Sequence, residues 1–205
     1  MSRLFLFDVD STLINEEVID LIAEYAGVAY QVSAITERAM SGQLDFDAAL
    51  TERVALLADL PISILDSVKS KITLTEGASE VIAQLQADGD HIAVVSGGFL
   101  EVITPLMHSL AISYFIAYSL VVVAGKLSGR VLGAIVNSSG IASYLMQLQS
   151  LLNPTQTIAI GDGANDIEMI KAADIGIAFC AKSSLREAAD IVIEQRDLRE
   201  ILKFL

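Results

Sequence analysis

The sequence predicts an α/β protein with an open, mainly parallel sheet flanked by helices and a small helical cap inserted after the first strand. Three observations support this fold class. Short apolar runs recur along the chain, and amphipathic helical patterns separate them. Between about residue 15 and residue 73 this alternation stops, and only helical patterns are found. Because strands that alternate with helices form parallel sheets, the interruption indicates an insertion.

The expected strands are short and rich in Val, Ile and Phe, as is typical of strands buried between two layers of helices. They are Leu4–Phe7, Ile92–Val95, Ile158–Ile160, Ile175–Phe179 and Ile191–Ile193. Two helical stripes lie between them, one formed by Val81, Ile82 and Leu85 and the other by Ile141, Leu145, Leu148 and Leu152.

Helical stripes also mark the inserted segment. One contains Val18, Ile19, Ile22 and Tyr25, and the other contains Phe46, Leu50, Val54 and Leu57. Pro61 should end the second pattern and start another helix. We therefore expect a core of residues 1–14 and 74–205 with a helical cap of residues 15–73 over the site. A small β excursion at about 118–136, with two strands joined by Ala124-Gly125-Lys126, is expected in the core.

The composition argues against several classes of protein. The 205 residues include 13 basic and 26 acidic side chains, and 53% are apolar, which is too hydrophobic for a disordered chain. The net charge of −13 argues against nucleic-acid binding, which needs clustered Lys and Arg. With no secretory signal visible and a single Cys180, we expect a cytoplasmic protein. Residues 102–125 carry no charged side chain, but Pro105 and His108 interrupt them, so we expect a buried helix and strand rather than a membrane span.

Two carboxylates stand directly after the first predicted strand. In an extended chain, side chains two residues apart point the same way, so Asp8 and Asp10 should converge at the carboxyl edge of the sheet. Open α/β sheets bind their ligands at that edge. One carboxylate could act as a nucleophile and the other as an acid and base, and their oxygens suit Mg²⁺. Taken alone, a simple turn capped by Asp10 explains the pattern equally well.

Two further predicted strands end in polar motifs. Ser96-Gly97-Gly98 offers a hydroxyl and accessible backbone N–H groups to an anion. In Gly161-Asp162-Gly163-Ala164-Asn165-Asp166, one helical turn separates the two acids. Each motif alone also fits an ordinary turn or helix start. Together, at one edge of a parallel sheet, they predict a single pocket for phosphoryl transfer.

These motifs resemble those of haloacid dehalogenase-like (HAD-like) hydrolases, which have a Rossmannoid core, and in particular their phosphoserine phosphatase branch. The likeness rests on Phe7–Leu13, Ser96–Phe99 and Gly161–Asp166, and it extends to Ile35–Met40 and Glu52–Leu57 in the cap. It implies Mg²⁺-dependent hydrolysis of O-phosphoserine to serine and phosphate through an aspartyl phosphate, the last step of serine biosynthesis.

The resemblance also implies a role for each matching residue. Asp8 would be phosphorylated, and Asp10 would protonate the serine oxygen and then activate water. Mg²⁺ would sit on Asp8, the carbonyl of Asp10 and Asp162, with Asp166 supporting from behind. The substrate-binding residues would be Ser96, Gly97 and Asn165 for phosphate, Glu17 for the ammonium group, Arg53 for the carboxylate, and Met40 and Phe46 for apolar contact. Without the family, Glu17 and Arg53 would be expected to face water.

One residue of the family pattern is missing. A lysine that normally pairs with the nucleophilic Asp falls at Ile141 in an ungapped match, and there is no Lys or Arg from Val131 to Ile170. Loss of one preorganised donor typically costs about 10²–10³ in rate, so a weakened phosphatase is expected. A relocated cation is the other expectation, and the nearest in sequence are Lys126, Arg130 and Lys171.

Two other functions stay open at this point. The chain could transfer phosphate from phosphoserine to another small hydroxyl, such as that of homoserine, or it could be a catalytically silent phospho-amino-acid binder. In each case we expect a small-molecule ligand and no nucleic-acid or membrane partner. The sequence leaves open whether the chain forms a homodimer.

Overall fold

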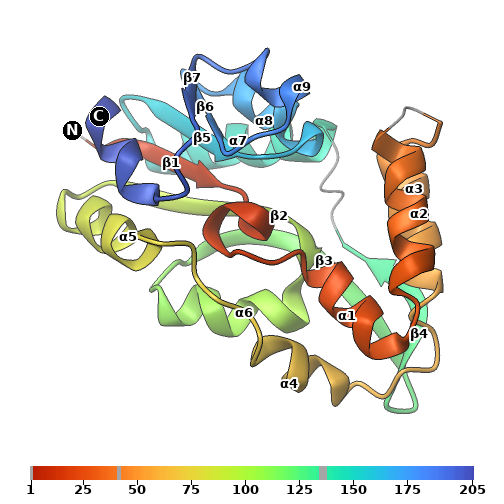
Figure 1. The fold of residues 1–205 in the computed structure, drawn as a ribbon. Coiled ribbons are helices and arrows are strands. Elements are labelled where there is room, and N and C mark those ends of the chain that lie inside the picture. The colour runs from red at the N-terminus through yellow and green to blue at the C-terminus, as the bar shows by residue number, and fades with distance from the viewer. Residues whose placement is uncertain (1, 41–42, 134–137) are drawn as a thin grey trace.

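The computed structural model describes residues 2–40, 43–133 and 138–205. Within them, one seven-stranded sheet has the order β4-β3-β2-β1-β5-β6-β7 (Figure 1). The strands are β1 (Leu4–Phe7), β2 (His91–Phe99), β3 (Tyr114–Val123), β4 (Lys126–Leu132), β5 (Thr157–Gly161), β6 (Ile175–Phe179) and β7 (Ile191–Ile193). Every neighbouring pair is parallel except β3 and β4, so the expected open, mainly parallel sheet is confirmed.

Helices cover both faces of the sheet, which explains why strands such as β1 and β6 are apolar throughout. Figure 1 shows α5 (Ala78–Ala87) and α6 (Leu100–Ser109) on one side of the sheet and α8 (Ile167–Ala172) and α9 (Ser183–Arg186) on the other. The remaining core helix, α7 (Ser138–Leu152), packs against α8. All four side chains of β1, at the centre of the sheet, are completely buried.

The register of the central strands brings the polar motifs together. β1 lies between β2 and β5, with Phe7 opposite Val94 on one side and Ile160 on the other. Because the three strands are parallel, the residues after these positions lie at the same carboxyl edge of the sheet. The motifs that begin at Asp8, Ser96 and Gly161 therefore meet at one place.

The segment between β1 and α5 is helical, as expected. It contains α1 (Val18–Ala26), α2 (Ala29–Met40), α3 (Phe46–Ala55) and α4 (Ile64–Lys69), and the irregular turn η1 (Val9–Leu13) joins it to β1. Its two connections to the sheet run side by side, because Ile14 pairs with Leu74 and the N–H of Thr75 donates to the carbonyl of Leu13 at 2.9 Å. The limits of the cap at residues 15 and 73 stay a prediction.

The β3–β4 hairpin supports the base of this cap, which the sequence did not predict. The N–H groups of Asp59 and Ile62 donate to the carbonyls of Leu127 and Gly125 at 2.9 and 3.0 Å, and the N–H of Leu127 donates to the carbonyl of Leu60 at 2.8 Å. Figure 1 shows α3 beside β4 accordingly. The cap is therefore attached to the core at the hairpin as well as at its two connections.

The structure corrects the expected β excursion. β3 begins at Tyr114 and pairs in parallel with β2, so its first half belongs to the main sheet rather than to a separate hairpin starting near 118. The antiparallel pairing with β4 agrees with the expectation, and residues 134–136 lie outside the described part of the chain. α6 and β3 account for the uncharged segment 102–125. No helix in the described ranges combines the length and the apolar character that a membrane crossing requires.

Candidate active site

Three carboxylates gather at the carboxyl edge of the sheet. Asp8 follows β1, Asp162 follows β5, and Asp166 ends the short helical turn η2 (Ala164–Asp166). One oxygen atom of each carboxylate lies within 4.8 Å of the others. Asp8 and Asp166 are both buried, with 3% of their surface exposed. Carboxylate oxygens grouped in this way are suited to a hard divalent cation such as Mg²⁺.

Burial and mutual repulsion oppose full ionisation of this cluster. Burial, followed by the charges of Asp166 and Asp162, raises the pKa of Asp8 well above its usual range. Burial is also the main reason why the pKa of Asp162 rises to about 6 and that of Asp166 to about 7. A cation among these oxygens would offset the repulsion, so the residues present fit a metal site. Such clustered, perturbed carboxylates are typical of catalytic sites.

Asp166 fixes the loop that follows β5. Its Oδ2 accepts hydrogen bonds from the N–H groups of Asp162 at 3.1 Å and Gly163 at 3.0 Å. Its Oδ1 accepts one from Asn165 Nδ2 at 2.9 Å. A Cβ atom on Gly161 would lie 2.5 Å from Asp166 Oδ2, so only glycine allows this approach. The structure thus places Asp166 behind the other two acids, while Asn165 keeps one amide hydrogen for a ligand.

Asp10 has an oxygen without a partner. It lies in η1, and its Oδ2 accepts a long hydrogen bond of 3.4 Å from the N–H of Val18 at the start of α1. Its Oδ1 is buried and has no hydrogen-bond partner among the described residues. Burial, followed by the charge of Glu17, raises the pKa of Asp10 well above its usual range. A buried carboxyl group that keeps its proton can donate it to a bound ligand, as a general acid does.

The last part of β2, where the sequence predicted a turn at Ser96, lies between Asp10 and the cap. Ser96 is completely buried, and its Oγ accepts a hydrogen bond of 2.9 Å from the N–H of Gly98. A Cβ atom on Gly98 would lie 3.3 Å from Asp10 Oδ2, and one on Gly97 would lie 3.4 Å from the ring of Phe46. The structure therefore brings Ser96, Gly97 and Phe46 together, and it adds Gly98 as a neighbour of Asp10.

The charged cap residues also lie near Asp10. Glu17, directly before α1, accepts a hydrogen bond of 2.7 Å from Ser11 Oγ, and its charge acts on both Asp10 and Asp162. Burial lowers the pKa of Arg53, and the negative charges of Asp20, Glu17 and Asp10 partly oppose this shift. Arg53 Nε donates to the carbonyl of Ala49 at 3.3 Å, and within the described ranges the guanidinium forms no ion pair. The side chain of Met40 lies outside the described part of the structure.

The position where the ungapped match places the family lysine is buried. Ile141 lies in α7, is 2% exposed and belongs to the apolar core. A lysine there would have to bury its ammonium group among apolar side chains, at a high cost in free energy. In this chain Ile141 is therefore a core residue.

The positive charges that act on Asp162 are not the ones expected from sequence. Lys171 pairs with Glu168 at 3.6 Å on the surface, and Lys126 and Arg130 are exposed on β4. The charges that oppose the raised pKa of Asp162 are those of Lys182 and Arg196. Both lie outside the motifs, and no local pattern distinguishes them from other surface cations, so sequence reasoning missed them.

Comparison with known proteins agrees with this geometry. A family model described as haloacid dehalogenase-like hydrolase matches residues 3–174. The chain belongs to the haloacid dehalogenase-like hydrolase family. The resemblance inferred from the motifs and the expectation of a hydrolase are therefore confirmed, and so is the expected HAD-like fold class.

Curated relatives of this chain include phosphoserine phosphatases. The protein from Methanocaldococcus jannaschii is 47% identical over 205 residues, which cover 99% of this chain and 97% of the relative. The protein from Lactococcus lactis is 46% identical over 204 residues, which cover 98% of this chain and 94% of the relative. The similarity thus spans the cap as well as the HAD-like core.

Solved structures show the same relationship. A substrate-bound phosphoserine phosphatase complex superposes with a TM-score of 0.95 at 46% identity and covers 100% of this chain and 99% of its own. A phospho-aspartyl intermediate analogue of phosphoserine phosphatase gives a TM-score of 0.94 at 47% identity, with the same coverage. This chain therefore shares the complete fold of these HAD-like hydrolases.

Proposed function

We propose that this chain is a Mg²⁺-dependent phosphatase that hydrolyses O-phosphoserine to serine and inorganic phosphate, the last step of serine biosynthesis. The observation that carries the proposal is the pairing of two different carboxyl environments at one strand end. Asp8 lies in a cluster with two further carboxylates, while Asp10 has a buried oxygen without a partner. Two carboxyl groups held in different states can divide the work of a nucleophile and a general acid.

In the first step, Asp8 attacks phosphorus and the bond between phosphorus and the serine oxygen breaks. Asp10 gives its proton to that oxygen, so that serine leaves as an alcohol rather than an alkoxide. The raised pKa of Asp10, caused by burial and by Glu17, keeps this proton available. The phosphoryl group then remains on Asp8 as an acyl phosphate.

In the second step, water attacks phosphorus and the bond to Asp8 breaks. Asp10, now ionised, takes a proton from the attacking water, which returns both carboxyl groups to their starting states. One water molecule is consumed for each phosphate released. The buried Ser96 hydroxyl, the N–H group of Gly97 and the second amide hydrogen of Asn165 would hold the phosphate oxygens during both steps.

The metal would be held by Asp8, the carbonyl of Asp10 and Asp162, with Asp166 orienting the loop behind them. Bound there, Mg²⁺ would keep Asp8 ionised and offset the charge of the phosphate oxygens. The support for this site is the set of three carboxylates within 4.8 Å, whose pKa values are raised in its absence.

The choice of substrate would depend on the cap. Phosphoserine carries an ammonium group and a carboxylate, which call for one acid and one bidentate cation. Glu17 and the half-buried Arg53, which has no ion-pair partner in the described ranges, supply these two charges near Asp10. Phe46, against Gly97, would form the apolar wall between them, together with Met40. We also propose that the enzyme acts in the cytoplasm, which is supported by its single free cysteine.

Phosphate release from a set of small phosphomonoesters tests the proposal. Phosphoserine, phosphothreonine, phosphoethanolamine and glycerol 2-phosphate would be compared, with Mg²⁺ and with a chelator. We expect Mg²⁺-dependent release with phosphoserine preferred, a loss of at least roughly 10³-fold for Asp8→Asn, and a loss of about 10²–10⁴-fold in kcat for Asp10→Asn.

Asp47→Asn, which changes an exposed acid on α3, is the matched control and should leave phosphate release unchanged. Release from phosphoserine by Asp8→Asn at the wild-type rate would overturn the mechanism. Transfer of phosphate to an added acceptor such as homoserine, in place of release, would overturn the assignment as a hydrolase.

A further inference from the structure

The C-terminal segment of the chain contacts both connections between the sheet and the cap. After β7, residues 194–197 lead into the short helical segment η3 (Leu198–Phe204). Arg196 contacts the first connection, residues 11–15, and Leu198 and Arg199 contact the start of α5, directly after the second. A segment far away in sequence therefore holds the two points from which the cap extends.

The contact made by Arg196 lies next to Asp10. Its Nε donates to Asn15 Oδ1 at 3.0 Å, and its Nη2 donates to the backbone carbonyl of Ser11 at 3.2 Å. Ser11 has a left-handed backbone conformation, with φ of 57°, which is uncommon for a residue with a side chain. One guanidinium group thus fixes the peptide between Ser11 and Thr12, one residue beyond Asp10.

Asp10 depends on this backbone for its orientation. Within the described ranges, the carboxyl group of Asp10 accepts one hydrogen bond, the 3.4 Å contact from the N–H of Val18 to its Oδ2, and its Oδ1 has no partner. The loop around it is held by Ser11 N–H, which donates to the Glu16 carbonyl at 3.2 Å, and by Ser11 Oγ, which donates to Glu17. Arg196 ties this loop to the C-terminal segment. Thr75 ties it to the second connection, because its Oγ donates to the Thr12 carbonyl at 2.7 Å and its N–H donates to the Leu13 carbonyl at 2.9 Å.

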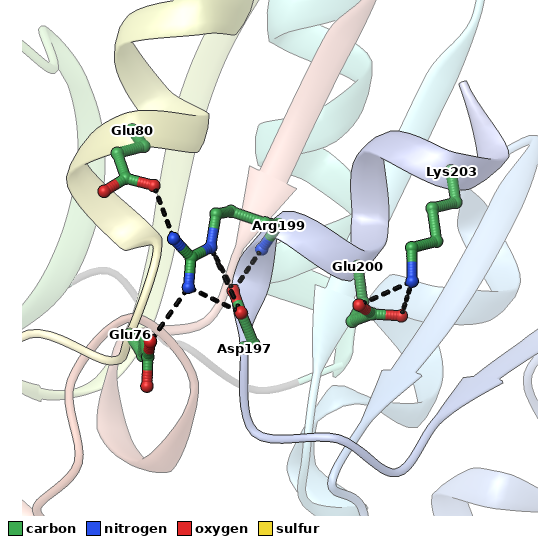
Figure 2. Close-up of polar contacts among 6 residues, drawn as sticks. All are labelled: Glu76, Glu80, Asp197, Arg199, Glu200 and Lys203. Carbon is green, nitrogen blue, oxygen red and sulfur yellow. Dashed lines mark hydrogen bonds and ion pairs between the residues drawn. The ribbon is translucent and has the colours of Figure 1, made fainter.

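The segment that follows Arg196 is anchored to the core by the ion pairs of Arg199, as Figure 2 shows. Arg199 donates to Glu76 at 2.8 Å, to Glu80 at 3.1 Å and to Asp197 at 2.7 Å, while Leu198 N–H donates to the Glu76 carbonyl at 2.9 Å. A Cβ atom on Gly77, whose φ is +77°, would lie 2.6 Å from Asp197 Oδ1, so this close approach requires glycine. Such exposed ion pairs contribute little individually, but as a network they fix the direction of the segment.

We propose that Arg196 is a positioning residue, which holds the loop of residues 9–13 and with it the carboxyl group of Asp10 in the geometry needed for proton transfer. This inference rests on the proposed function, in which Asp10 is the general acid. The guanidinium of Arg196 is exposed, so its loss should cost little stability, whereas a misplacement of about 1 Å at a catalytic group can cost about 10²-fold in rate. Arg196 also brings a positive charge to the side of Asp162.

The test compares Arg196→Ala and Arg196→Lys with the control Arg186→Ala. Arg186 is an exposed arginine that pairs with Glu194 in the same C-terminal region, but it does not contact residues 9–16 through any hydrogen bond in the described ranges. For each variant, kcat and KM for phosphoserine, the melting temperature, and hydrogen–deuterium exchange of residues 9–16 would be measured. The exchange measurement needs neither substrate nor metal.

For Arg196→Ala we expect kcat about tenfold lower, a KM within about threefold of wild type, and a melting temperature within about 2 °C. Hydrogen–deuterium exchange should be faster at residues 11, 14 and 15, whose N–H groups donate to the carbonyls of Glu16, Val9 and Thr73. Exchange in β5 should be unchanged. Arg196→Lys, which keeps one donor group and the charge, should recover part of kcat. Arg186→Ala should resemble wild type in every measurement.

A kcat for Arg196→Ala within twofold of that for Arg186→Ala would overturn the inference, and so would a lower kcat without faster exchange at residues 9–16. If the wild-type protein failed to hydrolyse phosphoserine, the proposed function would fail, and the exchange result alone would still decide whether Arg196 holds the loop. The two failures are therefore distinguishable.

Discussion

The metal-free protein should lose stability as the pH rises, and Asp162→Asn should remove the part of that loss that comes from this carboxyl group. Burial raises the pKa of Asp162 from its ordinary value of 3.8 to about 6. A carboxyl group with a raised pKa in the folded state stabilises the fold at low pH, and this contribution is lost as the pH rises through the folded pKa. At about 1.4 kcal/mol per pH unit, the difference between 3.8 and about 6 corresponds to about 3 kcal/mol in total.

About half of that effect, roughly 1.5 kcal/mol, falls between pH 5 and pH 8, because the unfolded carboxyl is already mostly ionised at pH 5. For a chain of this length, this corresponds to a difference of about 3–6 °C in melting temperature. Thermal unfolding in a chelator, followed by circular dichroism at both pH values, measures it. Between pH 5 and pH 8, the melting temperature of Asp162→Asn should therefore fall by about 3–6 °C less than that of the wild-type protein.

The exposed acid Asp47 provides the control, since Asp47→Asn should follow the wild-type pH dependence. Added Mg²⁺ should raise the melting temperature of the wild-type protein at pH 8 and have a smaller effect on Asp162→Asn, because a ligand that binds only the folded state stabilises it. An identical pH dependence for Asp162→Asn and wild type would refute the reasoning that this carboxylate is repelled and buried.

Three further substitutions test other parts of the site. Arg53→Ala should raise KM for phosphoserine about tenfold or more, but leave KM for phosphoethanolamine, which lacks the carboxylate, nearly unchanged in the same phosphate-release assay. Gly161→Ala should displace Asp166 and cost about 1–3 kcal/mol of unfolding free energy, measured by urea denaturation, and a Mg²⁺ titration should show about 10–100-fold weaker affinity. Ile141→Lys should lower the melting temperature without raising turnover, because it buries an ammonium group in the core; higher turnover would contradict this account.

Local patterns in the sequence were sufficient for most of the sheet. The apolar runs at residues 4–7, 175–179 and 191–193 are strands with these same limits, because a strand covered on both faces must be apolar at every position. β3 was placed too late, because segment 102–125 has no charged residue and its serines lie both before β3, at 109 and 113, and inside it, at 119. The support of the cap by β4 depends on pairing between distant residues, which periodicity does not indicate.

The candidate site was predictable where the chemistry is local to a strand end. Asp8 and Asp162 follow apolar strands, Ser96 lies near the end of β2, and the parallel register brings the three together. The environment of Asp10 was not predictable, because the burial of its Oδ1 depends on packing around the turn. The contact between Arg196 and Ser11 joins residues 185 positions apart, and nothing near either residue in the sequence signals it.

The backbone hydrogen bonds between residues 59–62 and β4 restrict how the entrance to the pocket can widen. A swing of the whole cap would have to break these bonds, or carry along a hairpin that is continuous with the sheet. The easier motion is a bend of α2 and α3 above this fixed pivot. Such a bend would move Phe46, at the far end of α3, away from Gly97, while Arg53, near the pivot, stayed in place. In the proposed function, substrate would then enter past Phe46 toward Arg53, whose position this bend leaves unchanged.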